Sequence, residues 1–131
     1  MQKHAILLVD DDALIINTLA KRFSTRDIEL YTANNPEEAK AVLEKVVPEL
    51  VILDLLLTKE DGSQGILDKL KSDPRLQNIP VIVLTNLDKP ELKDILLAQG
   101  VKEYVIKGSI SLDDLYEKVL GYLEPKSGNS K

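Results

Sequence analysis

The sequence contains no cysteine and only one histidine, His4, among its 131 residues. Without cysteine, the chain has no disulfide bond, no thiolate nucleophile and no cysteine-ligated zinc, which is typical of proteins in reducing compartments. With a single histidine at the start of the chain, we expect neither a histidine-rich metal site nor a phosphohistidine relay within the chain. These absences remove thiol chemistry and most imidazole chemistry from the candidate functions.

Long apolar runs and clusters of basic residues are missing as well. No apolar run approaches the ~20 residues that a membrane-spanning helix needs, and the first four residues lack the form of a signal peptide. The formal net charge is -5, and no cluster of lysine and arginine offsets it. We therefore expect no direct binding of nucleic acid by this domain. We also expect a cytoplasmic protein that is not attached to a membrane.

Short apolar runs alternate with longer amphipathic stretches along the chain. The runs cover residues 5–9, 28–32, 50–53, 81–84 and 104–106. Their nearly continuous apolar character predicts strands that are covered on both faces, as in a parallel sheet. Each run is followed by a helix pattern, and these patterns begin after Asp12, at Pro36, near residue 65, near Pro90 and after Ser111.

The helix patterns carry capping and packing signals. Asn35 is predicted to be an N-cap, with Pro36 as the first helical residue and Glu38 as the reciprocal capping carboxylate. The third helix is predicted over residues 65–72 and the fourth over residues 90–100. In the helix after Asp12, the 3.6-residue period predicts an apolar stripe that faces the core. Its members are Leu14, Ile15, Leu19 and Phe23.

Five strand–helix units in strict alternation predict an α/β domain with a parallel sheet between two layers of helices. Right-handed crossovers leave few topologies, and we predict the flavodoxin-like (βα)5 fold with strand order 2-1-3-4-5. Ligands of this topology bind beyond the carboxyl ends of the first and third strands. We assign the domain to residues 1–124 and predict a flexible polar tail over residues 125–131.

Polar side chains follow four of the predicted strands, at the point where each strand ends. Because the carboxyl ends of parallel strands lie at one edge of the sheet, these side chains are expected to form one site. A carboxylate can accept a phosphoryl group, and a divalent cation can neutralise the carboxylates. A lysine and a hydroxyl can hold the phosphoryl oxygens, so the set indicates phosphoryl transfer. It comprises Asp10, Asp11, Asp12, Asp54, Thr85 and Lys107.

The segments around these strand ends resemble the receiver domain of two-component response regulators, from about residue 4 to residue 124. The matching segments are residues 6–12 (ILLVDDD), 51–55 (VILDL), 81–85 (VIVLT) and 100–107 (GVKEYVIK). The resemblance implies a signalling domain in a phosphorelay rather than an enzyme with a separate substrate. Such a domain takes a phosphoryl group from a sensor histidine kinase or a phosphotransfer protein, and it catalyses its own phosphorylation and dephosphorylation.

The resemblance also implies roles for particular residues. Asp54 would accept the phosphoryl group. Asp10 and Asp11 would hold Mg²⁺ together with Asp54, with Asp11 binding directly and Asp10 largely through water. The backbone carbonyl of Leu56 would be a further ligand of the ion.

Three other residues would respond to the phosphoryl group. Thr85 would bind it, Lys107 would pair with it, and Tyr104 would be a switch residue that turns inward as the threonine moves. The output face would comprise the fourth helix, the fifth strand and the fifth helix, roughly from Pro90 to Leu123. That face would serve a homodimer or an output partner.

The chain departs from the family pattern at several positions near the site. Thr58 stands where a proline is common, Asn86 where alanine or glycine is common, and Gly108 where a cis proline is common. Glycine tolerates unusual backbone angles but does not favour a cis peptide bond, so we expect a more mobile loop there. Leu56 and Leu87 occupy positions that often tune dephosphorylation. Because both are apolar, we predict a long-lived phosphorylated form.

Two other interpretations remain open at this point. Asp10 and Asp12 at a strand end, with a hydroxyl residue and a lysine on later strands, also resemble haloacid-dehalogenase-type phosphatases. There Asp10 would be the nucleophile and Asp12 the general acid/base. That interpretation needs a late acidic motif, for which only Asp113 and Asp114 are available, and it gives Asp54 no role. The second alternative is a receiver-like adaptor that binds partners without phosphorylation.

Overall fold

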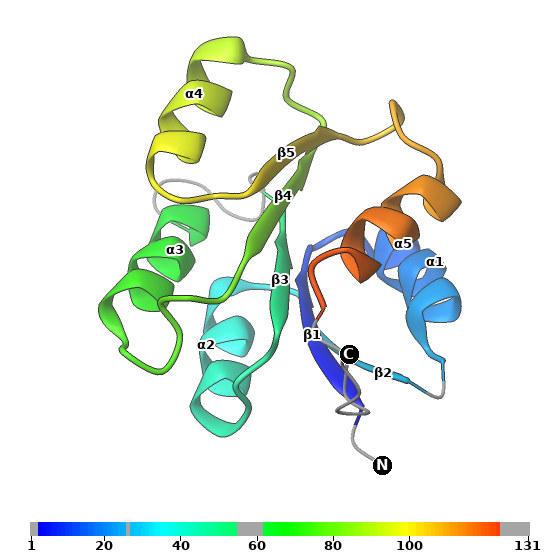
Figure 1. Ribbon diagram of the computed structural model, residues 1–131, viewed down its shortest axis with the longest axis horizontal. Coiled ribbons are helices and arrows are strands. Elements are labelled where there is room, and N and C mark those ends of the chain that lie inside the picture. The colour runs from blue at the N-terminus through cyan, green and yellow to red at the C-terminus, as the bar shows by residue number, and fades with distance from the viewer. Residues whose placement is uncertain (1–2, 26, 55–61, 124–131) are drawn as a thin grey trace, which may run out of the picture.

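The computed structural model describes residues 3–25, 27–54 and 62–123, which form alternating strands and helices (Figure 1). The strands are β1 (His4–Val9), β2 (Ile28–Ala33), β3 (Leu50–Leu53), β4 (Val81–Thr85) and β5 (Glu103–Ile106). The helices are α1 (Ala13–Phe23), α2 (Pro36–Lys45), α3 (Gly62–Ser72), α4 (Pro90–Ala98) and α5 (Leu112–Leu120). The alternation predicted from the apolar pattern is therefore confirmed.

The strands form one parallel sheet in the order β2-β1-β3-β4-β5, which confirms the predicted topology. β1 lies directly beside β3, and Val9 is opposite Leu53 in their register. Figure 1 shows α1 and α5 on one side of the sheet and α2, α3 and α4 on the other. The carboxyl ends of β1 and β3 are therefore level at the same edge of a three-layer domain.

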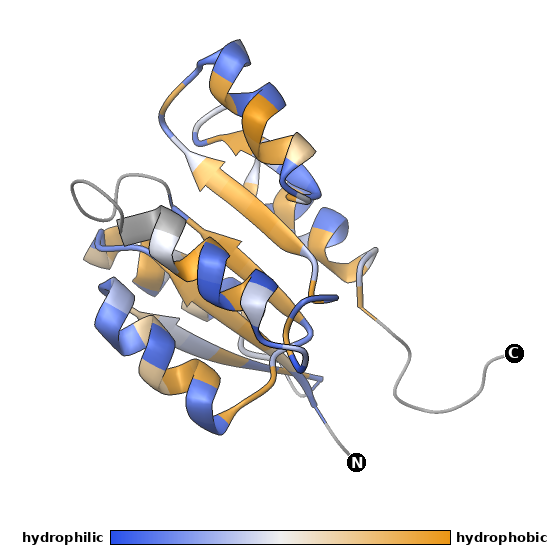
Figure 2. Ribbon diagram, turned by 90° about the vertical axis from the view of Figure 1, so that its left-hand side faces the viewer, coloured by the Kyte–Doolittle hydropathy of each residue, from blue (hydrophilic) through white to orange (hydrophobic). Residues whose placement is uncertain are grey.

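The central strands are buried on both faces, which explains their continuous apolar runs. Along β1, Leu7 and Val9 pack on the side of α2, α3 and α4. Ile6 and Leu8 pack on the side of α1 and α5. Figure 2 shows this pattern as apolar strands between helices whose outer surfaces carry most of the hydrophilic residues. Phe23 completes the second layer, where its buried ring meets Tyr116 edge to face at 5.2 Å between centroids.

The start of α2 follows its sequence signal with one difference. Asn35 is the N-cap, and its Oδ1 accepts a hydrogen bond from the Glu38 backbone N–H at 2.8 Å. Pro36 opens the helix as predicted. The Glu38 carboxylate reaches back to the N–H of Asn34 rather than to that of Asn35, at 2.8 Å. The reciprocal contact therefore forms one residue earlier than in a standard capping box.

Several details of the helices differ from the prediction. α3 begins at Gly62, before the predicted residue 65, and α4 ends at Ala98, before the predicted residue 100. Leu14 was placed on the inward stripe of α1, but 72% of it is exposed. Because each residue turns a helix by about 100°, Leu14 points away from the side of α1 on which Leu19 and Phe23 lie. Leu19 and Phe23, further along α1, are buried as predicted.

None of the helices within residues 3–25, 27–54 and 62–123 is long and apolar enough to cross a membrane.

Three of the predictions made from the sequence concern residues outside the ranges that the structure describes. They are the metal-ligand role of Leu56, the departure at Thr58, and the polar tail over residues 125–131.

Candidate functional site

Two buried carboxylates stand side by side at the carboxyl edge of the sheet. Asp10 follows β1 and Asp54 follows β3, and they are only 1% and 4% exposed. Backbone hydrogen bonds hold both residues in the sheet, because the Asp54 N–H bonds to the Val9 carbonyl and the Asp10 N–H to the Ala33 carbonyl, each at 3.0 Å. The sheet thus brings together two acidic groups whose charges repel each other.

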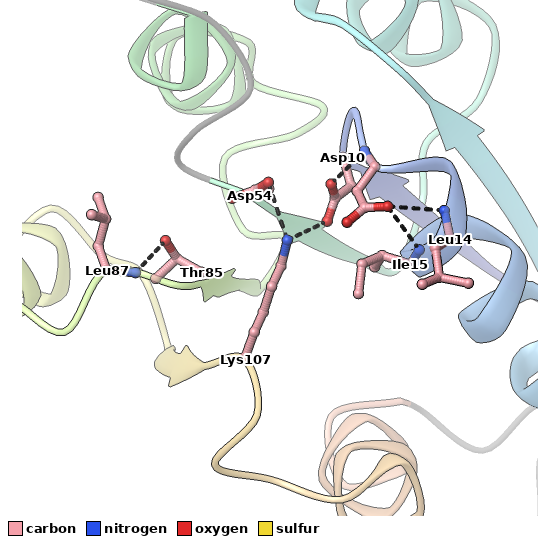
Figure 3. Close-up of polar contacts among 8 residues, drawn as sticks. Asp10, Leu14, Ile15, Asp54, Thr85, Leu87 and Lys107 are labelled. Atoms are coloured by element: carbon pink, nitrogen blue, oxygen red, sulfur yellow. Dashed lines mark hydrogen bonds and ion pairs between the residues drawn. The ribbon is translucent and has the colours of Figure 1, made fainter.

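Lys107 extends from the end of β5 to a position between the two carboxylates (Figure 3). Its Nζ lies 2.9 Å from Asp10 Oδ2 and 3.3 Å from Asp54 Oδ2. Burial alone would lower the pKa of Lys107, but the contacts with Asp10 and Asp54 outweigh it and raise the pKa above the ordinary value. The lysine therefore stays protonated at neutral pH and offsets part of the carboxylate charge.

The groups around Asp10 offset only part of the cost of burying its negative charge. Burial is the main cause that raises the pKa of its carboxyl group, and the charge of Asp54 adds to it, against the lowering effect of Lys107 and of the Asp12 N–H. Its Oδ1 accepts a hydrogen bond from that N–H at 2.9 Å. Its Oδ2 accepts no hydrogen bond from the described residues. The contact of Oδ2 with Lys107 Nζ, at 2.9 Å, is an ion pair.

The arrangement fits a divalent cation. Asp10, Asp11 and Asp54 each present a carboxylate oxygen within 4.8 Å of the others. Asp11 is exposed, so the group opens to solvent on that side. Oxygen ligands of this kind suit Mg²⁺, and the buried Asp10 Oδ2 is an acceptor that a cation can use. The structure therefore brings together the three carboxylates predicted to hold the metal.

Asp12, the third residue of the acidic run, caps a helix. Its Oδ1 caps α1 by accepting hydrogen bonds from the backbone N–H groups of Leu14 at 2.9 Å and Ile15 at 3.4 Å (Figure 3). Asp113 lies in the first turn of α5 and pairs with Arg22 at 3.0 Å. The general acid/base of the phosphatase interpretation, Asp12, and one residue of its late acidic pair, Asp113, therefore have structural roles. Asp54, which that interpretation leaves without a role, lies at the centre of the site.

Thr85 is the last residue of β4 and is fully buried beside the acidic cluster. Its Oγ1 accepts a hydrogen bond from the Leu87 N–H at 3.2 Å. The carbonyl of Leu87 in turn accepts one from the Tyr104 hydroxyl at 2.6 Å. The backbone N–H and carbonyl of Leu87 thus join the predicted phosphoryl-binding hydroxyl to the predicted switch residue. Sequence reasoning missed this link, because a backbone contact has no residue-type signature.

The loop after β5 settles one question that the sequence left open. All described peptide bonds are trans, including the bond between Lys107 and Gly108. Gly108 has φ = +85°, in the left-handed region where a side chain would be strained. Glycine at this position therefore gives the chain a backbone conformation that a proline could not adopt.

The chain matches the response regulator receiver domain family over residues 6–120. It therefore belongs to this family of signalling domains, which act with histidine kinases in two-component systems. It is 38% identical over 106 residues to a probable transcriptional regulator, ycf27, of Pyropia yezoensis. It is 36% identical over 101 residues to the heme response regulator HssR of Staphylococcus aureus. These matches cover 81% and 77% of this chain but only 42% and 43% of the relatives, so the chain spans less than half of their length.

Solved structures show the same fold. The Mn²⁺-bound form of response regulator Rcp1 is 30% identical, with a TM-score of 0.73 and coverage of 90% of both chains. The phosphorylated cyanobacterial phytochrome response regulator RcpA is 31% identical, with a TM-score of 0.73 and coverage of 91% of this chain and 90% of that one. A signal receiver domain from Vibrio parahaemolyticus reaches a TM-score of 0.81 at 22% identity, over 92% and 89% of the chains, and supports the fold alone.

Proposed function

We propose that this domain accepts a phosphoryl group on Asp54 from a phosphohistidine, with Mg²⁺ bound by Asp10, Asp11 and Asp54. The observation that carries the proposal is the position of the Asp54 carboxylate, 3.3 Å from Lys107 Nζ and within the three-carboxylate group. A buried nucleophile flanked by a fixed cation and a metal site is suited to phosphoryl transfer, in which catalysis is mainly positioning and charge stabilisation.

Each residue of the site has a part in the proposed reaction. An oxygen of the Asp54 carboxylate attacks the phosphorus, the P–N bond to the donor imidazole breaks, and the bonding electron pair leaves with that imidazole, which keeps or takes up a proton. Lys107 pairs with a phosphoryl oxygen, and the Thr85 hydroxyl donates to another. Bound Mg²⁺ supplies charge neutralisation between the carboxylates and the phosphoryl oxygens. Leu56, outside the described residues, would add its carbonyl as a ligand.

The relatives support both the metal and the modification. One solved relative carries Mn²⁺ and another is phosphorylated. The structural support in this chain is the buried Asp10 Oδ2, which accepts no hydrogen bond from the described residues. Lys107 already occupies the side of Asp54 on which a phosphoryl oxygen would need a positive charge.

The proposed partners are a sensor histidine kinase or a phosphotransfer protein as donor, and an output partner or a second copy of the chain. A donor has to bring its phosphohistidine to the edge of the sheet, where the 72% exposed Leu14 offers an apolar contact. On the output face, from Pro90 to Leu123, Ile95, Leu97 and Leu120 are exposed apolar residues that a partner can cover. We place this function in a receiver domain over residues 1–124, in the cytoplasm.

Treatment with acetyl phosphate tests the proposal directly. In Mg²⁺, intact mass is expected to show one added phosphoryl group, and peptide mapping is expected to place it on Asp54. Chelation of the metal with EDTA is expected to abolish the labelling, because the carboxylates then repel the incoming phosphoryl group. Protein that stays unlabelled in Mg²⁺ would instead favour the phosphorylation-independent adaptor.

The phosphorylated form is expected to be long-lived. Hydrolysis requires a water molecule aligned with phosphorus, and a side chain that can orient it accelerates such a step. Leu87 is half-buried next to the site and has no polar atom on its side chain. Leu87→Gln is expected to shorten the lifetime of the acyl phosphate roughly tenfold, as measured by intact mass after removal of the donor. Wild-type label that disappears within seconds would contradict this expectation.

A further inference from the structure

Glu103, the first residue of β5, holds the segment that follows α5. Its Oε2 accepts a hydrogen bond from the Tyr122 hydroxyl at 2.5 Å, and its Oε1 lies 3.3 Å from Lys118 Nζ. The hydrogen bond from Tyr122 is the main cause that lowers the pKa of Glu103, and the same bond raises the pKa of Tyr122 to about 12. At neutral pH the carboxylate is therefore ionised and the phenol protonated, which makes this a charge-assisted hydrogen bond.

The contact lies where the chain leaves the domain. Tyr122 is two residues beyond α5, and its ring packs against the core on the side of α1 and α5. Three backbone amides form the last turn: the Gly121 N–H bonds to Glu117, the Tyr122 N–H to Val119, and the Leu123 N–H to Leu120, at 3.0–3.2 Å. Beyond this turn the chain continues into residues 124–131. The Glu103–Tyr122 contact thus holds the last turn of the chain that the structure describes.

The same strand carries the predicted switch residue. Successive side chains of a strand point to opposite faces, so Glu103 faces α5 together with Val105, while Tyr104 faces the α4 side. Tyr104 is linked through the Leu87 peptide to Thr85. Two tyrosine hydroxyls, bonded on opposite faces of β5, therefore connect the phosphoryl site to the turn that follows α5.

β5 is well suited to transmit a displacement. It is an edge strand that pairs only with β4, so a shift of its first residues breaks no hydrogen bonds on a second side. When the Thr85 hydroxyl turns toward a phosphoryl oxygen, it gives up the Leu87 N–H. The Leu87 backbone then loses this contact on its N–H side and can turn, so that the carbonyl of Leu87, in the following peptide group, is no longer aligned with the Tyr104 hydroxyl.

We propose that the Glu103–Tyr122 contact is a regulated latch, which opens when the phosphoryl site is filled and releases the last turn, residues 121–123. The proposal rests on the function proposed for Asp54 and adds the place where occupation of that site reaches the rest of the chain. The geometry supplies a continuous set of contacts, and coupling must be measured to establish that the set carries a signal.

Amide hydrogen exchange in the last turn tests the latch. Gly121, Tyr122 and Leu123 are hydrogen-bonded probes, and each is to be followed with and without Mg²⁺ and beryllium fluoride, a mimic of the phosphoryl group. In the wild type, the three exchange rates are expected to rise roughly fivefold when the mimic binds, as expected for the loss of one hydrogen bond. In Tyr122→Phe, the exchange rates without the mimic are expected to be higher than in the wild type already. Binding of the mimic is then expected to raise them no further.

A matched control and a reciprocal measurement separate coupling from simple bracing. Tyr116→Phe changes a tyrosine within α5 whose ring contacts Phe23 and Arg22, and it is expected to behave like the wild type. Because coupling is reciprocal, Tyr122→Phe is also expected to bind beryllium fluoride roughly fivefold more tightly, since the latch no longer opposes the active state.

The outcomes separate the latch from the function on which it rests. If acetyl phosphate labels Asp54 but the three wild-type amides do not respond to the mimic, the latch is overturned and the phosphorylation function stands. A response in Tyr122→Phe equal to that of the wild type also overturns the latch, because the contact is then only a structural brace. If wild-type protein cannot be labelled at all, the proposed function fails, and the latch falls with it.

Discussion

Asp54→Asn is expected to abolish phosphorylation by acetyl phosphate. The substitution replaces the nucleophilic carboxylate with an amide of nearly the same shape, which cannot form the acyl phosphate under these conditions. We expect the labelling rate to fall at least ~10³-fold, equivalent to about 4 kcal/mol of activation free energy at about 1.4 kcal/mol for each factor of ten. Intact mass after incubation with donor and Mg²⁺ measures the effect.

The loss of labelling in Asp54→Asn will not come from unfolding. Removing one of two buried neighbouring charges relieves their repulsion, so urea denaturation without Mg²⁺ is expected to show no loss of stability. Asp12→Asn is the matched control, because asparagine keeps the oxygen that caps α1, and it is expected to label like the wild type. Phosphate-ester turnover that needs Asp12 but not Asp54 would instead favour the phosphatase interpretation.

Lys107→Met is expected to lower the free energy of unfolding by about 3 kcal/mol in the absence of Mg²⁺. The substitution keeps an apolar chain of similar length but leaves the buried carboxylates of Asp10 and Asp54 without the cation between them. The loss of stability has an upper limit of about 4 kcal/mol, because one of the two carboxyl groups can take up a proton instead. Protonation at pH 7 relieves the repulsion and costs about 1.4 kcal/mol for each unit by which the pH exceeds the ordinary pKa of the group. Urea denaturation at pH 7 measures the change.

Added Mg²⁺ is expected to restore part of the stability of Lys107→Met. The ion binds the folded state alone and replaces the missing positive charge, so the stability difference from the wild type narrows as the site fills. Lys102→Met, which changes an exposed lysine just before β5, is the control and is expected to stay within about 0.5 kcal/mol of the wild type. A Lys107→Met protein as stable as the wild type without Mg²⁺ would show that the lysine does not compensate these carboxylates.

Much of the fold and the identity of the site residues could be predicted from the sequence. Strand positions follow from continuous apolar runs, because a parallel strand covered on both faces has no polar alternation. The strand order follows from the strict alternation of elements and the handedness of crossovers. Asp10, Asp54, Thr85 and Lys107 could be assigned to one site, because the ends of parallel strands share an edge.

The limits of prediction also have physical reasons. Leu14 is apolar, but at about 100° per residue it lies on the side of α1 opposite Leu19 and Phe23, so apolar character alone did not place it in the core. The early start of α3 at Gly62 had no signal in the sequence, because glycine is a poor helix former. The trans bond at Gly108 had no sequence signal that decided it.

Local sequence patterns establish which residues this protein has for phosphoryl chemistry and which edge of the sheet they occupy, because both follow from signals repeated along the chain. The contacts among these residues come from the tertiary structure alone. Lys107 meets Asp54 across 53 positions of sequence, the backbone of Leu87 joins Thr85 to Tyr104, and Glu103 accepts a hydrogen bond from Tyr122. Such contacts depend on side-chain directions and backbone groups from separate elements, which are fixed only when the layers pack together.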